Sequence, residues 1–236
     1  MSDVDLFEAE TAVLTRATQV VASGAEEPEQ YRQALEELVK SYGRLMRESR
    51  RLIARSDRTE RELNQLNSRL KQLSDELDYK ARHDNLTGAL NRGAIFERAH
   101  HFLKSSSLSL VVLDIDFFKR INDEFGHPTG DAVIRELVNR LRRTLNGEGD
   151  IGRVGGEEFT ILLPGVSLEA AVIIAEEIRI AIVQEAFPCL PSRPVTSSFG
   201  ISWSDVGADF EDAYARADAA LYKAKHGGRN RVERDV

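Results

Sequence analysis

Two adjacent acidic side chains stand in a short segment that is otherwise suited to a turn. Residues 153–159 read RVGGEEF, so Glu157 and Glu158 follow two glycines and lie between apolar runs. Carboxylate oxygens are hard ligands, and they suit a divalent cation where the substrate is a phosphate ester. The pair therefore indicates a metal site that acts on phosphate chemistry.

A second pair of acids closes an apolar run. Residues 109–113 are almost entirely apolar and are followed by Asp114 and Asp116, which is typical of a buried strand that carries acids to its carboxyl end. Side chains alternate along a strand, so these two acids share one face. If this strand neighbours the RVGGEEF segment in one sheet, we expect Asp114, Glu157 and Glu158 to converge on a metal ion.

Extended and helical patterns alternate through the second half of the chain. β-branched and aromatic residues at 151–154 and 159–163 predict a hairpin, whose two-residue turn would use the positive φ that Gly155 and Gly156 tolerate. Asp116 either joins the acidic site or caps a helix that begins after it. Further strands are expected at 108–115 and 195–203, and helices at 95–103, 131–145, 168–185 and 210–225. The alternation indicates an α+β domain.

The first 82 residues show helical periodicity instead. Apolar residues recur at helical intervals in 2–22, and a second helix is expected from Pro28 to about Arg82. At 1.5 Å per residue this helix would be a rod of roughly 80 Å, too long to pack across one small domain. Its apolar residues follow a heptad, with Leu35, Tyr42, Leu63, Leu70 and Leu77 at one seam position and Leu38, Leu45, Leu52, Leu66 and Leu73 at the other.

The heptad predicts that the long helix needs a partner. Unbroken leucines at 63–77 favour a dimeric coiled coil over a lone surface helix or an intramolecular hairpin with residues 2–22. Three polar residues interrupt the seam further upstream, at Ser49, Ser56 and Thr59. For residues 28–60, packing against another protein therefore stays an open alternative.

Composition excludes several classes of protein. The chain has 236 residues, a formal net charge of −7 and one cysteine, Cys189. A single cysteine cannot form an internal disulfide, which suits a reducing compartment. No apolar run approaches the roughly 20 residues of a spanning helix, and no basic stripe offers a surface for nucleic acid. We therefore expect a cytoplasmic protein with no membrane insertion and no nucleic-acid partner.

Several spaced motifs make the chain resemble the GGDEF-family diguanylate cyclases. They read HDNLTGALNR at 83–92, DIDFFKRIND at 114–123, GHPTGD at 126–131, RVGGEEF at 153–159, and ADAALYKAK at 217–225 followed by GRN at 228–230. The resemblance covers about residues 83–232. It implies a central, mainly antiparallel sheet wrapped by helices, as in nucleotidyl cyclases, in a catalytic domain at 83–236. The helical region at 1–82 would be a coiled-coil stalk.

The same resemblance implies a reaction and its metal ligands. Such enzymes condense two GTP molecules into cyclic di-GMP and release two pyrophosphates, each step being attack of a ribose 3′-hydroxyl on an α-phosphorus. Asp114 and Glu158, with the Ile115 carbonyl, would hold Mg²⁺ or Mn²⁺, with two ions expected at each GTP site. Glu157 would help the hydroxyl lose its proton or would also bind metal, and the sequence leaves both roles open.

The residues that would hold the phosphates come from two motifs. Lys119 lies one turn into the helix after Phe117 and Phe118, and the first amides of that helix are natural donors to an anion. The resemblance implies that Lys225 and Arg229 clamp the distal phosphates. Without it, these two bases would be read as a solvated basic tail.

The residues that would recognise guanine follow closely. The resemblance implies that Asp131 accepts hydrogen bonds from guanine N1–H and N2–H. It also implies that the Asn122 side-chain amide donates a hydrogen bond to guanine O6 or N3. His127 either lines the base pocket or is an ordinary loop residue. Gly155 and Gly156 would let the nucleotide approach the backbone closely.

One motif of many family members is out of register. An inhibitory RxxD motif would fall at residues 146–149, where this chain reads NGEG, with Asp150 displaced by one position and Arg142 and Arg143 further upstream. Feedback by cyclic di-GMP through that site is therefore in doubt.

The expected control of activity lies in the helical region. Two GTP-loaded domains must face each other, so we expect a homodimer formed through the stalk. About 80 residues of helix cannot enclose a small-molecule pocket, so the input should come from an activating soluble protein that binds residues 1–60. The alternative function is a catalytically silent scaffold that binds GTP or cyclic di-GMP and acts through its coiled coil.

Overall fold

The computed structural model describes residues 7–24 and 28–235. The chain divides into two compact units, residues 1–74 and 75–236. Residues 2–6 of the first predicted helix lie outside the described residues. Within those residues, no helix is both long and apolar enough to cross a membrane.

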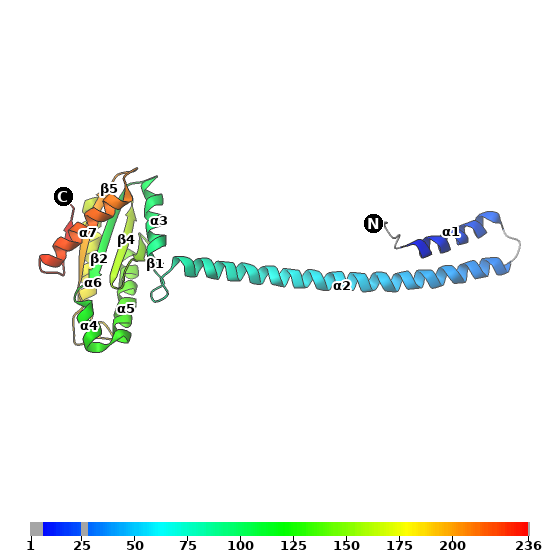
Figure 1. Cartoon of the computed structure of the whole chain (residues 1–236), viewed down its shortest axis with the longest axis horizontal. Coiled ribbons are helices and arrows are strands. Elements are labelled where there is room, and N and C mark those ends of the chain that lie inside the picture. The colour runs from blue at the N-terminus through cyan, green and yellow to red at the C-terminus, as the bar shows by residue number, and fades with distance from the viewer. Residues whose placement is uncertain (1–6, 25–27, 236) are drawn as a thin grey trace. The chain divides into compact units, whose positions relative to one another are not determined.

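The first unit contains α1 (Glu8–Ser23) and most of α2 (Pro28–Arg82). Glu10 accepts a hydrogen bond from Arg44 at 2.9 Å, and Arg16 lies 3.6 Å from Glu37. These pairs hold α1 beside the first turns of α2, as Figure 1 shows. An intramolecular hairpin, the alternative that the sequence favours less than a dimer, therefore forms between α1 and this end of α2. The pair of Arg16 and Glu37 is exposed, and an ion pair of that kind contributes little to stability.

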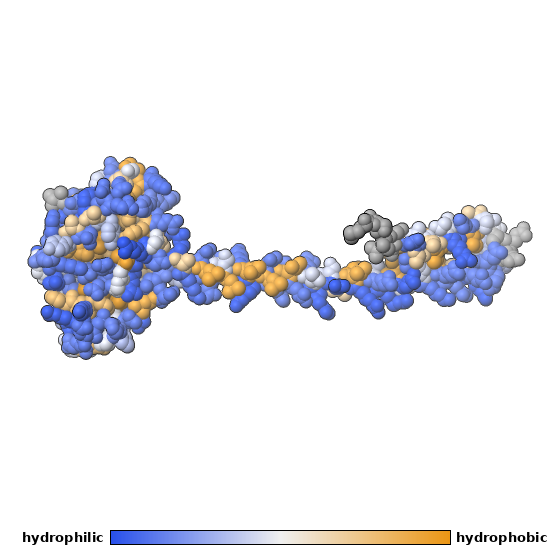
Figure 2. Space-filling model, viewed as in Figure 1, coloured by the Kyte–Doolittle hydropathy of each residue, from blue (hydrophilic) through white to orange (hydrophobic). Residues whose placement is uncertain are grey.

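The downstream seam of α2 is exposed, and none of the residues that the structure describes covers it. None of the described residues of α2 is buried, and the five leucines at 63–77 are 41% to 67% exposed (Leu63, Leu66, Leu70, Leu73 and Leu77). They form an apolar row along the helix in Figure 2. An exposed apolar row on one helix face is typical of the seam of a coiled coil.

The second unit is built on one six-stranded mixed sheet with the order β1-β3-β4-β2-β5-β6. The strands are β1 (Leu90–Asn91), β2 (Leu108–Ile115), β3 (Asp150–Arg153), β4 (Glu158–Pro164), β5 (Ser197–Ser204) and β6 (Val232–Arg234). The three inner pairings are antiparallel, and β1 and β6 add parallel edges. The expected α+β fold with a mainly antiparallel sheet is confirmed.

Five helices accompany the sheet (Figure 1). They are α3 (Arg92–Leu103), α4 (Phe118–Phe125), α5 (His127–Leu145), α6 (Leu168–Gln184) and α7 (Phe210–His226). The alternation of β2 places Val111, Leu113 and Ile115 in the core that α5 and α6 close. Leu110 and Val112 face the smaller core under α3 and α7. Asp114 continues this second series and therefore emerges toward α7.

The hairpin that carries the acids differs from its predicted form. β3 and β4 are joined by residues 154–157, and neither Gly155 nor Gly156 has a positive φ. The prediction of a two-residue turn that needs positive φ is wrong. A Cβ at residue 155 would lie 2.7 Å from Glu158 Oε2, so a side chain there would require the Glu158 carboxylate to move.

Candidate active site

The acids of the two motifs meet at one end of the sheet. β2 and β4 are neighbours, and Asp114 stands opposite Glu158 in their register. Asp114 is 5% exposed, and its Oδ2 lies 2.8 Å from the Lys225 ammonium, which α7 supplies. The predicted convergence of residues 114 and 158 is therefore present, together with one of the predicted phosphate-binding bases.

The site holds an excess of negative charge. Burial raises the pKa of Asp114, and the carboxylates of Glu158 and Asp116 raise it further, against the opposing effect of Lys225. Burial also raises the pKa of Glu157, with added repulsion from Asp114 and Glu158. Carboxylates that repel one another in a half-buried place are stabilised by a bound cation.

The residues at this end of the sheet fit a divalent ion whose remaining ligands are oxygens of a nucleotide. Among the described residues, no three His, Cys, Asp or Glu side chains already form a metal cage. Mg²⁺ in phosphate-processing sites is usually held by one or two carboxylates plus substrate oxygens. The facing pair Asp114 and Glu158 supplies that number, and Gly155 leaves room for the second carboxylate.

Asp116 does not cap α4, but its carboxylate acts on Asp114 in the acidic site. It is buried, and it accepts hydrogen bonds from the Thr196 and Ser198 hydroxyls at 2.7 Å and from the Asn230 amide at 3.0 Å. The N-cap of α4 is Phe117, and no side chain caps that helix. The interpretation of Asp116 as a helix cap is wrong. Its three donors occupy both of its oxygens, so it ties β2 to β5 and to the segment after α7.

The predicted phosphate-binding residues lie on two segments that meet. Phe117 ends the link from β2 to α4, and the Arg229 guanidinium lies over its ring at 4.4 Å. Lys119 is exposed on the first turn of α4, whereas Phe118 points into the core. Phe118 therefore contributes only its backbone to the surface. Lys225 and Arg229 are brought to the acids and to Phe117, respectively.

The predicted guanine-reading residues are also brought together. Asn122 on α4 lies so close to Gly130 on α5 that a Cβ at residue 130 would meet its Oδ1 at 2.0 Å. Asp131, the next residue, is exposed. His127 is exposed at the first position of α5. Asn122 on α4 therefore packs against the residue that precedes Asp131 on α5.

One contact of the signature segment could not be anticipated. Arg153 donates from Nη1 to both oxygens of Asp84 at 3.1 and 3.2 Å, and from Nε and Nη2 to the Gly156 carbonyl at 3.2 and 2.7 Å. Burial alone would raise the pKa of Asp84, but hydrogen bonds from Thr87 and Arg153 lower it overall. Asp84 and Arg153 are 69 residues apart in the sequence, so no local pattern predicts their contact.

The residues near the missing RxxD motif are committed to other contacts. Asp150 pairs with Arg98, and Arg142 donates to the Thr87 carbonyl at 3.2 Å. Arg143 lies 3.4 Å from Glu185. None of them presents a free pair of arginine and aspartate at the loop 146–149.

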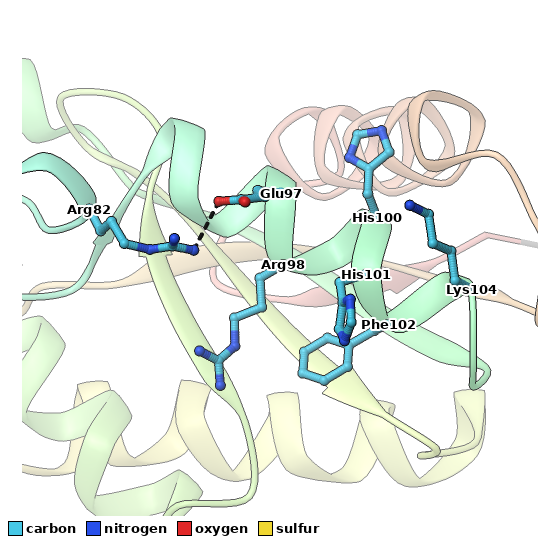
Figure 3. Close-up of a pocket in the computed structure, with 7 residues that line it drawn as sticks. All are labelled: Arg82, Glu97, Arg98, His100, His101, Phe102 and Lys104. Carbon is cyan, nitrogen blue, oxygen red and sulfur yellow. Dashed lines mark hydrogen bonds and ion pairs between the residues drawn. The ribbon is translucent and has the colours of Figure 1, made fainter. Parts of the chain in front are cut away.

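A cavity of about 840 Å³ lies against α3 and contains none of the predicted site residues. Figure 3 shows its lining residues and marks the ion pair between Arg82 and Glu97. The Arg82 Nη2 and Glu97 Oε2 atoms of this pair are 2.9 Å apart. His100 lies 3.5 Å from Glu211. Because much of its charge is already paired within the protein, the acidic end of the sheet is the better candidate for catalysis.

Comparisons with known proteins show the family of this chain. A family model described as diguanylate cyclase, GGDEF domain, matches residues 81–231. The chain is 44% identical over 161 residues to the diguanylate cyclase DgcP of Pseudomonas aeruginosa, which covers 65% of this chain and 24% of that protein. The chain thus spans about a quarter of the length of this relative.

Two solved structures resemble the chain beyond the sheet domain. The coiled coil and GGDEF domain of DgcB from Caulobacter crescentus, in complex with c-di-GMP, is 31% identical, with a TM-score of 0.67 over 78% of this chain and 98% of that one. The diguanylate cyclase SiaD of Pseudomonas aeruginosa, in complex with its activator SiaC, is 28% identical, with a TM-score of 0.63 over 97% and 88%.

Proposed function

The chain belongs to the GGDEF family of diguanylate cyclases, and from this premise we propose that it condenses two GTP molecules into cyclic di-GMP with release of two pyrophosphates. The observation that carries the proposal is the facing pair Asp114 and Glu158, with Lys225 2.8 Å from the former. Two carboxylates and a base at one sheet end suit transfer of a nucleotidyl group. The catalytic domain would be residues 83–236.

Asp114 and Glu158, with the Ile115 carbonyl, would hold the metal, and we propose two ions of Mg²⁺ or Mn²⁺ at each GTP site. When bound, such ions neutralise phosphate oxygens as charge develops on them. The burial of Asp114 keeps its oxygens in one orientation. Gly155 leaves the Glu158 carboxylate free to turn toward the same place.

Glu157 is our candidate for the group that takes the proton of the 3′-hydroxyl. Its pKa is raised by burial and by the neighbouring carboxylates, and a raised pKa makes a carboxylate a better proton acceptor near neutral pH. Glu157 lies at the end of the 154–157 connection, next to Glu158. A shared role in metal binding stays compatible with this position.

GTP would lie between the two groups of side chains already described. Lys119, Lys225 and Arg229 would hold the triphosphate, together with the first amides of α4 beside Phe117 and Phe118. Asn122 and Asp131 would read the guanine edge, with His127 at the rim. Their placement on α4 and α5 supports this order, because Asn122 already packs on Gly130.

Activity would depend on a homodimer. Each domain binds one GTP and supplies half of the reaction, so two domains must face each other. The exposed leucines at 63–77 of α2 offer the surface on which a second copy would form the coiled coil.

A soluble activating protein would bind residues 1–60. SiaD, which resembles 97% of this chain, was solved with its activator, and the α1 hairpin leaves Leu14, Val21, Leu35 and Val39 more than half exposed. A pull-down should recover the partner with the full chain and not with a form that begins at Gln65. Equal recovery by both would contradict this part of the proposal.

One assay separates an active cyclase from a silent GTP-binding scaffold. Purified full-length protein is incubated with GTP and Mg²⁺, and the nucleotides are resolved by chromatography and identified by mass. Cyclic di-GMP and pyrophosphate in a ratio of one to two support the cyclase. Bound but unchanged GTP at high protein concentration would support the scaffold.

A further inference from the structure

We propose that Asp116 and Phe117 are positioning residues that hold the Arg229 guanidinium in place for the GTP phosphates. The inference rests on the proposed function, and it deepens that function by assigning a role to the link between β2 and α4. Neither side chain needs to touch the substrate for this role. Both would act through the segment that follows α7.

The conformation of Phe117 is the first observation. Its φ is 58°, in the left-handed region, where a residue with a side chain is strained by about 1–2 kcal/mol. The ring is also 45% exposed, so burial of apolar surface does not explain why a large aromatic residue stands here. Backbone strain of this kind persists where the surrounding structure enforces it, and such residues cluster at functional sites.

The surroundings of the Phe117 ring supply a reason. The Arg229 guanidinium lies 4.4 Å from the ring centre and the Arg120 guanidinium lies 4.9 Å from it. Both distances are within the range in which an aromatic face attracts a cation. The ring therefore forms a platform for two positive charges, one from α4 and one from beyond α7.

Asp116 fixes the backbone that carries Arg229. Arg229 and Asn230 both adopt positive φ, at 62° and 45°, and the Asn230 amide donates to Asp116 Oδ2 at 3.0 Å. The Arg229 amide donates to the Ala224 carbonyl at the end of α7. Asp116 is itself held by Thr196 and Ser198 on the β5 side. The tight turn after α7 is thus anchored to the sheet.

The two contacts act on the same side chain from two ends. Asp116 sets where the Arg229 backbone lies, and Phe117 sets where its guanidinium lies. An arginine that is already held in position loses less conformational freedom when it binds phosphate. Loss of the aromatic face should therefore weaken triphosphate binding while the charge of Arg229 remains.

The test measures binding, so that it does not depend on turnover. The full-length protein is titrated with α,β-methylene GTP and Mg²⁺ in a calorimeter. Phe117→Leu keeps an apolar side chain without an aromatic face and should raise the Kd by about two- to fivefold. Phe117→Tyr keeps the face and should raise the Kd less than twofold. Phe102→Leu is the matched control, because Phe102 lies under the Arg98 guanidinium outside the site.

A double-mutant cycle decides whether Phe117 acts through Arg229. In an Arg229→Met background, Phe117→Leu should cause no further loss of affinity, whereas independent roles would give multiplying losses. Asp116→Asn should likewise raise the Kd for the analogue more in the wild-type protein than in the Arg229→Met protein. Thermal unfolding of each variant checks that it is folded.

Each result bears on one of the two claims. One outcome is that the wild-type protein binds the analogue while the losses from Phe117→Leu and Arg229→Met multiply. That result would overturn the positioning role and leave the proposed function standing. Equal Kd values for Phe117→Leu and the wild-type protein would do the same. No binding of the analogue by the wild-type protein would overturn both.

Discussion

The Lys225 ammonium lies 2.8 Å from Asp114 Oδ2. The Lys225 side chain comes from the last turns of α7, and Asp114 is the residue before the last one of β2. A lysine in this place can neutralise Asp114 or pair with a phosphate, but it cannot do both at full strength. Binding of a phosphate by Lys225 would therefore weaken its contact with Asp114.

Replacing Lys225 should expose this link. Lys225→Met leaves Asp114 buried without its counter-ion, which should lower the free energy of unfolding by about 1–3 kcal/mol in metal-free buffer. Added Mg²⁺ should restore more stability to the variant than to the wild-type protein. Thermal unfolding with and without Mg²⁺ measures both effects. Lys223→Met, exposed on the same helix, is the control. Equal melting temperatures for all three metal-free proteins would contradict the prediction.

The link between Asp84 and Arg153 predicts a pH dependence of stability. Folding lowers the pKa of Asp84, because hydrogen bonds from Thr87 and Arg153 outweigh the effect of burial. A carboxyl of this kind contributes stability above its unfolded pKa and loses it as the pH falls through its folded pKa. Asp84→Asn should therefore lower the melting temperature at pH 7, and the difference should shrink toward about pH 3.

The exposed acid Asp75 supplies the comparison for that experiment. Asp75→Asn should follow the wild-type melting curve across the whole pH range. A difference between Asp84→Asn and wild type that stays constant down to the lowest pH would show that the carboxylate charge is not responsible.

The seam of α2 predicts that activity depends on protein concentration. Leu70→Glu places a charge in the exposed leucine row, where it would oppose the same charge in a second copy. Specific activity should fall sharply at nanomolar protein and recover in part at micromolar protein. Ser68→Glu adds the same charge on the opposite face of the helix and should leave activity unchanged. Equal activity of both variants at every concentration would exclude the seam as the dimer surface.

The contacts near residues 146–149 predict weak feedback. Arg142 and Asp150 already bind the Thr87 carbonyl and Arg98, so cyclic di-GMP would have to displace these contacts. Added cyclic di-GMP should inhibit only at high concentration, as a product that competes for the active site does. Calorimetry that finds tight binding of a product dimer at a separate site would contradict this prediction, and Arg142→Ala and Arg143→Ala would then locate it.

Several features of the site could be predicted because they follow from short-range rules. The period of two along β2 placed Asp114 and Asp116 on one face, and the apolar run located the strand that the structure has at 108–115. Strands β1 and β6 were missed because two or three residues carry no readable period. The positive φ expected at Gly155 was wrong, because residues 154–157 form a longer connection than a two-residue turn.

Other features depend on contacts between distant parts of the chain. Arg140 is 2% exposed and donates to carbonyls at the end of α6, including those of Ile182 and Glu185, while Phe187 packs under its guanidinium. In the sequence it looks like any surface arginine of α5. The partners of Asp116 at Thr196, Ser198 and Asn230 are equally remote. No local pattern announces such contacts.

The central claim is that Asp114 and Glu158 hold the ions that make this chain a cyclase. The rate of cyclic di-GMP formation at saturating GTP and Mg²⁺ tests it, in full-length wild-type protein, Asp114→Asn, Glu158→Gln and the exposed-acid control Glu177→Gln. We predict a loss of about a hundredfold or more in the two site variants, with melting temperatures close to wild type and an unchanged control. Wild-type rates in either site variant would contradict the account.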